Sequence, residues 1–362
     1  MQQTIIGWDI GGAHVKAALL NSDGLLQQVC LQPCPLWQGI EQLHLAVTQV
    51  TVALKVTQAT HVITMTGELV DCFASREAGV QQIIAAMVQL LPAQALFIFA
   101  GKQGFLPVEQ VTVTHVEAIA SANWLATAYF VAQQLQYGLL IDIGSTTTDI
   151  LLLNNKTVQA QGFTDYQRLV SGELIYTGII RTAVMAVARQ AMFNGQQQGL
   201  MAEYFATMAD VYRVTRELQE AHDHSATADG AEKTLVASAR RLSRMTGHDF
   251  RVEDMALWQQ FALTLREQQL QLLTAGVTRQ LSRGLLPPQS CFIGAGVGRF
   301  LVRTLAQQLG YAYRDFDELI TTAPYPRSFN ERESKSLTAA DCAPAVAVAL
   351  LFASALRWRL VF

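Results

Sequence analysis

Short apolar segments separated by turns open the chain. Their pattern predicts strands over 4–10, 15–20 and 25–31, and the first turn is a Gly-Gly pair. Strand-like segments at 61–65 and 95–100 then alternate with helical patterns. We therefore expect a three-strand meander that continues into a mixed α/β domain.

A helix is predicted over 118–135, and the opening pattern then starts again. Strands are expected over 137–143, 148–153 and 156–163. The strings GWDIGGAHVKAALL and LIDIGSTTTDILLL share a strand, an Asp, a Gly turn and a second strand. An internal duplication of a hairpin-led α/β domain explains this repeat.

The pattern becomes irregular in the second half of the chain. Gln-rich and charged strings predict a mostly helical insertion over about 194–255, with a mobile connection at 221–230. Regular order returns with a long helix that ends near Arg283, a strand over 290–293 and a helix over 299–309.

Composition and charge are typical of a globular protein with small ligands. The chain has 362 residues, of which 51% are hydrophobic and 15% charged, and its net charge is -3. A single core rarely extends over such a length, so we expect two domains, over 1–135 and 136–362, with a cleft between them. No block of Lys and Arg is present, which argues against nucleic acid or an anionic membrane as a partner. The composition leaves the oligomeric state open.

Cysteine spacing and the C-terminal segment bear on location. The five cysteines are scattered and form no Cys-x-x-Cys pair, which favours a reduced, cytoplasmic compartment over a disulfide scaffold or a zinc ribbon. The apolar run from Ala343 to Leu356 is shorter than the roughly 20 residues that a bilayer needs, so a buried terminal helix is expected. His222 and His224 flank an Asp, but their polar surroundings favour a solvated loop over a metal site.

The first Gly turn carries candidate phosphate chemistry. Asp9 ends a strand, Gly11 and Gly12 form the turn, and Lys16 lies on the returning strand. Backbone amides at glycines can approach phosphate oxygens closely, a lysine can neutralise them, and a carboxylate can hold Mg²⁺ through water. The alternative is a plain Gly-Gly hairpin with a surface lysine.

The second turn repeats this plan and adds hydroxyl groups, with Asp142 as its carboxylate. The predicted phosphate ligands here are Gly144, Ser145, Thr146, Thr147 and Thr148. Two matching loops can face each other across a cleft and bracket a di- or triphosphate. A third turn, with Gly294, Gly296 and Gly298, follows a strand and opens a helix, as anion-binding turns do. Its late position in the chain argues against a dinucleotide site.

The order of these three turns resembles the superfamily of acetate and sugar kinases, Hsp70 and actin over nearly the whole chain. The string IDIGSTTTDI is similar to the second phosphate loop of the hydantoinase and oxoprolinase group. GWDIGGAHVKAA, MTGELVDCF, SANWLATA and SGELIYTGIIRT resemble the proteins linked to tetrahydromethanopterin-dependent C1 transfer, whose archaeal members are assigned to methanofuran biosynthesis. The resemblance implies two duplicated actin-like (ribonuclease H-like) α/β domains. It also implies a transferase that joins an aminomethylfuran diphosphate to a phenol, a tyramine or tyrosine derivative, and releases diphosphate.

Two other classes of function stay open. One is an ATP-dependent small-molecule kinase or a hydantoinase-like or oxoprolinase-like hydrolase that binds ATP and ADP, and the other is a non-catalytic nucleotide-binding switch. Kinases of the superfamily often carry Thr or Ser after the paired glycines, where this chain has Ala13. The missing hydroxyl weakens the case for ATP phosphoryl transfer and is compatible with diphosphate as a leaving group.

Carboxylates supply the remaining candidate roles. Asp9 and Asp142 fit a Mg²⁺ site, while a phenol, with a pKa of about 10, needs a base. Glu68 and Asp71 in TGELVDCF, and Glu173 in SGELIYTG, are the candidate bases because each lies close to a Gly after a strand-like or turn segment. The alternative for all three is a helix N-terminal acid, which the helix dipole favours.

Overall fold

The computed structural model describes residues 4–91, 95–323 and 337–359, and these residues form two compact units that interleave along the chain. The first unit comprises Met1–Gly138, Leu153–Gln167 and Asp315–Phe362. The second comprises Leu139–Leu152 and Arg168–Arg314. The predicted domain ranges, 1–135 and 136–362, stay a prediction.

The first unit is built on a six-stranded mixed sheet in the order β3-β2-β1-β4-β5-β6. Its strands are β1 (Ile5–Ile10), β2 (His14–Leu20), β3 (Leu26–Pro33), β4 (Thr60–Met65), β5 (Ala95–Phe99) and β6 (Phe105–Pro107). β1, β2 and β3 pair antiparallel, which confirms the predicted meander, and β4 and β5 continue the sheet parallel to β1.

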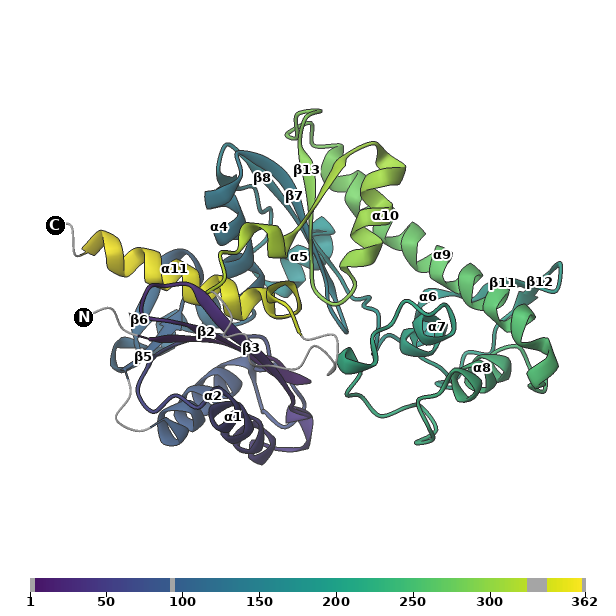
Figure 1. Ribbon diagram of the computed structural model, residues 1–362, viewed down its shortest axis with the longest axis horizontal. Helices are drawn as coiled ribbons and strands as arrows, with labels where there is room; N and C mark the ends of the chain where they lie inside the picture. Colours follow the sequence, from purple (N-terminus) through teal and green to yellow (C-terminus); the bar gives the residue numbers. More distant parts are fainter. Residues whose placement is uncertain (1–3, 92–94, 324–336, 360–362) are drawn as a thin grey trace. The chain divides into compact units, whose positions relative to one another are not determined.

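Helices cover both faces of this sheet (Figure 1). They are α1 (Glu41–Leu54), α2 (Arg76–Leu90), α3 (Val116–Ile119), α4 (Asn123–Gln134) and α11 (Ala343–Arg359). Alternate residues of a strand point to opposite faces, so Trp8 packs in the core with α1 and α2, and Gly7 faces α11. A Cβ at Gly7 would lie 2.2 Å from the carbonyl oxygen of Ala345, so glycine allows the last helix to lie close to β1.

The last helix is the apolar run at the end of the chain. By length and composition alone, Ala339–Leu356 could cross a membrane, but 72% of this segment is buried in the structure. It packs on β1, β2, β4 and α4 of the first unit. The prediction of a buried terminal helix is therefore confirmed.

The second sheet has the order β10-β8-β7-β13-β14, with β9 paired to β8. Its strands are β7 (Tyr137–Ile143), β8 (Thr148–Asn154), β9 (Thr157–Val158), β10 (Leu174–Ile175), β13 (Cys291–Ala295) and β14 (Ala312–Asp315). The strand predicted over 156–163 is wrong beyond β9. Asn155 and Lys156 have φ angles of 55° and 60°, which turn the chain sharply, and the apolar residues that follow find no strand to pair with among those described.

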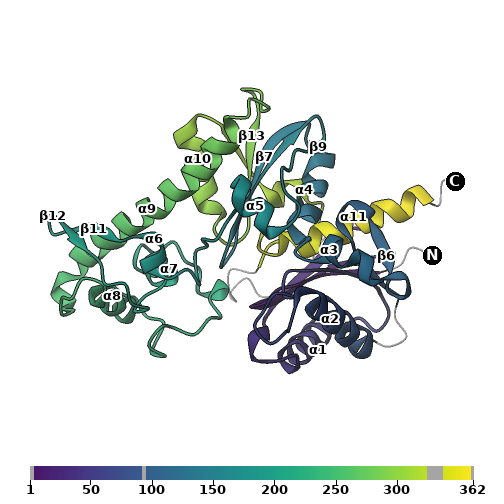
Figure 2. The same cartoon turned by 180° about the vertical axis from the view of Figure 1, so that it is seen from behind.

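A long helix and a small hairpin extend the second unit. The helices are α5 (Asp165–Ser171), α6 (Val184–Val187), α7 (Met208–Val214), α8 (Leu235–Arg244), α9 (Met255–Leu281) and α10 (Arg299–Leu309). The hairpin of β11 (Gln190–Phe193) and β12 (Gln196–Gly199) lies beside α9, as Figure 2 shows. The prediction of a mostly helical insertion over 194–255 is wrong, because α7 and α8 form only a minor part of it and the rest is mainly a strand, turns and loops.

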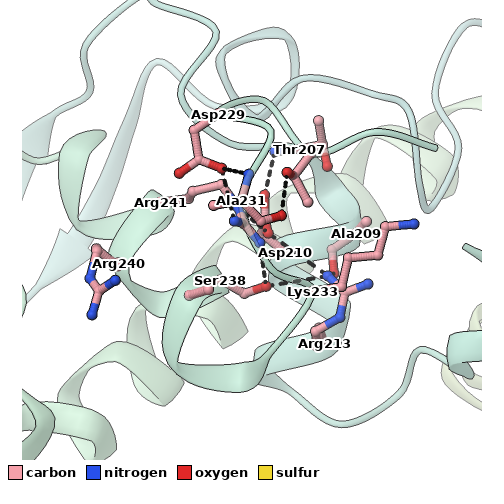
Figure 3. A network of polar contacts seen from close by, with 12 residues as sticks. Thr207, Ala209, Asp210, Arg213, Asp229, Ala231, Lys233, Ser238, Arg240 and Arg241 are labelled. Carbon is pink, nitrogen blue, oxygen red and sulfur yellow. Dashed lines mark hydrogen bonds and ion pairs between the residues drawn. The ribbon is translucent and has the colours of Figure 1, made fainter.

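Buried ion pairs hold the segment 221–230, which was predicted to be mobile (Figure 3). Arg213 Nη2 donates to Asp223 Oδ2 at 2.6 Å, and Arg241 bonds Asp210 at 2.8 Å and Asp229 at 3.0 Å. The Ser238 hydroxyl accepts from both guanidinium groups. The expected solvated loop is wrong for His222 and Asp223, which are only 5% and 7% exposed, because ion pairing draws this connection inward.

Candidate functional site

The two predicted phosphate turns have the same backbone arrangement. Gly11 N donates to His14 O at 3.0 Å, and Gly144 N donates to Thr147 O at 2.9 Å. In each case the residue before the Gly ends a strand and the residue two before it is the Asp. The repeat in the sequence is therefore also a repeat in structure.

A second correspondence links the loop after β4 to the turn after β13. The carbonyl of Ile10 accepts from Thr66 N at 2.9 Å and from Gly67 N at 3.0 Å, and the carbonyl of Ile143 accepts from Gly298 N at 2.8 Å. The segment that carries Glu68 is thus the first unit's counterpart of the GAGVG turn. Each unit closes its Asp-Gly turn with one further Gly-containing loop.

Asp9 is a buried carboxylate, 4% exposed, at the end of β1. The strand registers place Lys16 directly opposite it on β2 and Thr64 beside it on β4. Asn123 Nδ2 donates to Asp9 Oδ1 at 3.2 Å from the first residue of α4. An amide donor and a cation therefore surround the carboxylate that was predicted to hold Mg²⁺.

Some polar groups of the hydroxyl-rich turn in the second unit form hydrogen bonds within the protein. The carbonyl of Ser145 accepts from Ile180 N and Arg181 N, and Thr148 Oγ1 donates to Thr177 O at 2.7 Å. Thr148 is fully buried, so its hydroxyl serves this internal bond. Ser145, Thr146 and Thr147 are only partly buried.

Close packing accounts for the glycines of the third turn. A Cβ at Gly294 would lie 2.7 Å from the hydroxyl oxygen of Tyr313, and one at Gly298 would lie 2.5 Å from Cγ2 of Ile143. Gly296 has a φ of +76°, and its Cβ would lie 2.3 Å from Asp142 Oδ1. The turn therefore lies directly against Asp142, and its contact with phosphate stays a prediction.

Glu68 belongs to a cluster of acids in the first unit that the sequence did not reveal. Ser121 Oγ lies 2.7 Å from Glu68 Oε1 and 3.0 Å from Asp165 Oδ2. Arg76 Nη2 lies 2.8 Å from Asp165 Oδ2, and Arg76 Nε lies 4.0 Å from Glu68 Oε1. We call Glu68, Ser121, Asp165 and Arg76 the acid cluster.

A break in a predicted helix places Ser121 in this cluster. The helix expected over 118–135 is in fact two: α3 ends at Ile119 and α4 begins at Asn123. Between them Ser121 has a φ of 51°, a conformation that is uncommon outside glycine. Strain of this kind persists only where the surroundings hold it, and it is frequent at functional sites.

Burial dominates the electrostatics of Glu68. Its side chain is fully buried, and burial raises the pKa of its carboxyl above the usual value, although the Ser121 hydrogen bond and the Arg76 charge work in the opposite direction. Glu68 Oε2 is buried and has no hydrogen-bond partner among the described residues. A carboxyl in this position is stable when it carries a proton.

The other predicted bases have different surroundings. Asp71 lies exposed in the loop between β4 and α2. Glu173, in the second unit, is fully buried, accepts from Ser171 Oγ at 2.8 Å and lies 3.7 Å from the Arg283 guanidinium. These contacts give Glu173 a cation and a hydroxyl, whereas they leave Asp71 open to solvent.

Sequence reasoning missed Ser121, Asp165, Arg76 and Asn123. The cluster joins positions that are 53 and 44 residues apart, so no local spacing connects them. One sequence signal did point to this cluster, because the string SANW is part of the segment that resembles a known family.

The fold is found in a solved structure described as nucleotide-free acetone carboxylase, in a study of ATP-dependent acetone carboxylation. The two superpose with a TM-score of 0.53 at 10% identity, over 86% of this chain and 68% of that chain. Such low identity supports the fold alone. The α/β architecture with two mixed sheets agrees with the predicted fold class.

Sequence comparison then gives the family. The hydantoinase/oxoprolinase model matches residues 59–319. The (4-{4-[2-(gamma-L-glutamylamino)ethyl]phenoxymethyl}furan-2-yl)methanamine synthase of Methanocaldococcus jannaschii is 32% identical over 247 residues, which are 68% of this chain and 72% of the relative. The enzyme of the same name from Methanococcus vannielii is 33% identical over 124 residues, 34% of this chain and 55% of the relative. The chain therefore belongs to the hydantoinase/oxoprolinase family and is a homologue of these methanofuran-biosynthesis synthases.

Proposed function

We propose that the protein forms the aryl ether of a methanofuran-type cofactor. In this reaction a phenol, a tyramine or tyrosine derivative, attacks the methylene carbon of an aminomethylfuran diphosphate, and diphosphate leaves. The enzyme would therefore be a transferase with diphosphate as the leaving group.

The names of the two relatives support this reaction. Each describes a product in which a phenoxymethyl group is attached to a furan, which is the bond that the proposed reaction forms. The strings that first suggested the family include TGEL with Glu68 and SANW with Ser121 and Asn123, and both lie in the site of the first unit.

The observation that carries the proposal is the position of residues 121 to 123. Asn123 bonds the turn carboxylate Asp9, and Ser121, two residues earlier, bonds Glu68 and Asp165. The carboxylate that we propose for the diphosphate site and the acids that can accept a proton thus lie close together in one unit. A displacement needs both, because the leaving group and the nucleophile react at the same carbon.

Mg²⁺ is the ion that we propose for the diphosphate. Among the described residues, no three His, Cys, Asp or Glu side chains gather in the way that a protein-only metal site needs. In phosphate sites Mg²⁺ commonly uses one or two carboxylates together with phosphate oxygens and water, so Asp9 in the first unit and Asp142 in the second are each a candidate ligand. When bound, the ion would stabilise the charge that develops on the leaving diphosphate.

Backbone and side-chain groups of the chain would assist it. We propose that amides of the turns at Gly11-Gly12, 144–148 and 294–298 and the hydroxyls of Ser145, Thr146 and Thr147 donate to phosphate oxygens, and that Lys16 contributes a positive charge. Glu68, Asp71 and Glu173 are the predicted receivers of the phenolic proton, and the full burial of Glu68 means that it acts together with its neighbours in the acid cluster. We also propose a cytoplasmic location, where free thiols such as the five in this chain persist.

A direct assay tests the proposed function. Purified protein is incubated with Mg²⁺, the aminomethylfuran diphosphate and a panel of tyramine and tyrosine derivatives, and ether and diphosphate are followed by mass spectrometry. We expect both products in equal amounts with at least one phenol. ATP turnover on a small acceptor without ether would establish the kinase or hydrolase alternative, and nucleotide binding without turnover would establish a switch.

A further inference from the structure

The acid cluster contains fewer protons than its contacts require. The Ser121 hydroxyl has one proton, yet its oxygen lies within hydrogen-bond distance of a carboxyl oxygen of both Glu68 and Asp165. If both acids were ionised, one of the two contacts would bring two oxygens together without a hydrogen. One of the acids therefore carries a proton in this arrangement.

The surroundings decide which acid that is. Asp165 forms a close ion pair with Arg76, and its side chain is 22% exposed. Glu68 is fully buried, its second oxygen has no hydrogen-bond partner among the described residues, and Arg76 is 4.0 Å away. Arg76 and Asp165 are the charged groups that act on Glu68, and the nearer contact of Arg76 is to Asp165. The proton belongs to Glu68, which donates to Ser121, and Ser121 donates to Asp165.

We infer that Asp165 is the catalytic base of the proposed ether-forming reaction, and that Ser121 and Glu68 are positioning residues that hold it. This inference rests on the proposed function. Asp165 is the acid of the cluster that solvent, and hence a substrate, can reach. Glu68 has no exposed surface, so it can act only through Ser121.

The step is balanced without a further reactant. The phenolic O–H bond breaks and its proton passes to Asp165, while the phenolic oxygen bonds to the furan methylene carbon. The bond from that carbon to the diphosphate oxygen breaks, and the electron pair leaves with the diphosphate. Asp165 then returns the proton to solvent.

The surroundings of Asp165 suit an aromatic alcohol. Phe163, two residues earlier, is 37% exposed and lies beside Trp124, with 6.2 Å between the ring centroids. Lys102 Nζ lies 3.5 Å from the centre of the Phe163 ring. An apolar ring two residues from the base in the chain, with a cation over that ring, favours a phenol that becomes negatively charged as it reacts.

Single substitutions in the full-length enzyme test the inference, because each removes one chemical group of the acid cluster. Asp165→Asn should lower kcat by about 100-fold or more, the usual contribution of a general base, with little change in KM for the diphosphate. Glu68→Ala should lower kcat, and Glu68→Gln should recover most of that loss, because an amide can still donate to Ser121. Ser121→Gly removes the hydroxyl without straining the backbone and should lower kcat with little change in KM for the diphosphate. Glu77→Gln changes an exposed acid of the same helix as Arg76 and serves as the control.

Varying the pKa of the acceptor phenol distinguishes a general base from a residue that only supports the structure. A phenol that is already ionised at the assay pH needs no base, so the deficit of Asp165→Asn should shrink as the pKa of the acceptor phenol falls. The assignment is overturned if the loss of kcat in Asp165→Asn is the same for every phenol. It is also overturned if Glu68→Gln loses activity while Asp165→Asn keeps it. Either result leaves the proposed ether-forming reaction unchanged. Wild-type protein that forms no ether with any phenol overturns the proposed function and the assignment together.

Discussion

Asn123 Nδ2 donates a hydrogen bond of 3.2 Å to Asp9 Oδ1, although 114 residues separate the two side chains. The bond fixes the start of α4 against the first Gly turn. Because Ser121 lies just before this helix and bonds Glu68, one short segment orients both the turn carboxylate and the acid cluster.

The two turn carboxylates should each contribute to Mg²⁺-dependent binding of diphosphate. Asp9→Asn and Asp142→Asn remove a charge at nearly constant shape, and we expect each to weaken the binding of Mg²⁺-pyrophosphate about tenfold or more, as loss of a charged ligand does. Isothermal titration calorimetry measures the effect, with Asp23→Asn in an exposed turn as the control. Unchanged affinity in both variants would place the diphosphate elsewhere.

Glu68→Gln should stabilise the protein increasingly as pH rises. Burial raises the pKa of Glu68 in the folded state above its ordinary 4.5, so the folded protein binds more protons than the unfolded chain above that pH. Stability is therefore lost as pH rises through the folded pKa, and a glutamine, which cannot ionise, avoids this loss. Urea unfolding at pH 4.5 and 8 should show an advantage for Glu68→Gln only at the higher pH. A variant that is less stable than wild type at pH 8 would show that Glu68 is stabilised as an anion.

His61 should make the first unit sensitive to acid. Its Nδ1 accepts a 2.9 Å hydrogen bond from Trp8 Nε1, and burial lowers the pKa of the imidazole from 6.5 to about 4. The unfolded chain then binds the extra proton first, so stability falls as pH drops from 6.5 towards 4, by about 2 kcal/mol at pH 5. His61→Gln keeps an acceptor for Trp8 but cannot titrate. Its unfolding free energy should therefore fall less than that of wild type between pH 7.5 and 5, and equal losses would contradict the prediction.

The charge network of the second unit should stabilise the connection over 221–230. Asp223→Ala leaves the buried Arg213 without its closest partner, and we expect a loss of about 3 kcal/mol in unfolding free energy, as for other broken buried pairs. The loosened segment should also be cut sooner in limited proteolysis. Asp249→Ala, at an exposed position, is the control and should change neither measurement. Equal proteolysis rates for the two variants would show that the network does not hold the segment.

Local patterns were enough to predict much of the fold. The strands β1 and β2 follow from apolar segments around a Gly-Gly turn, and their antiparallel pairing follows from the shortness of that turn. α10 begins at Arg299 and ends at Leu309, as predicted, because glycines flank it on both sides. These elements are defined by residues next to each other in the chain.

The failures occur where distant residues decide the conformation. SANWLATA reads as uninterrupted helix, yet Ser121 leaves the helical region and its hydroxyl bonds two acids from other segments. The polar string around Asp223 reads as solvated loop, yet Arg213 pairs with it inside the protein. Hydrophobic periodicity carries no information on such polar contacts, so the acid cluster could be found only in three dimensions.

Oxygen labelling tests the central claim, that the phenolic oxygen attacks carbon and not phosphorus. A phenol substrate carrying ¹⁸O is incubated with the protein, Mg²⁺ and the aminomethylfuran diphosphate, and the products are analysed by mass spectrometry. The proposed reaction predicts that the aryl furan ether retains the ¹⁸O and that the released diphosphate contains none. Label found between the phenol and a phosphoryl group, with no labelled ether, would show phosphoryl transfer and contradict the account.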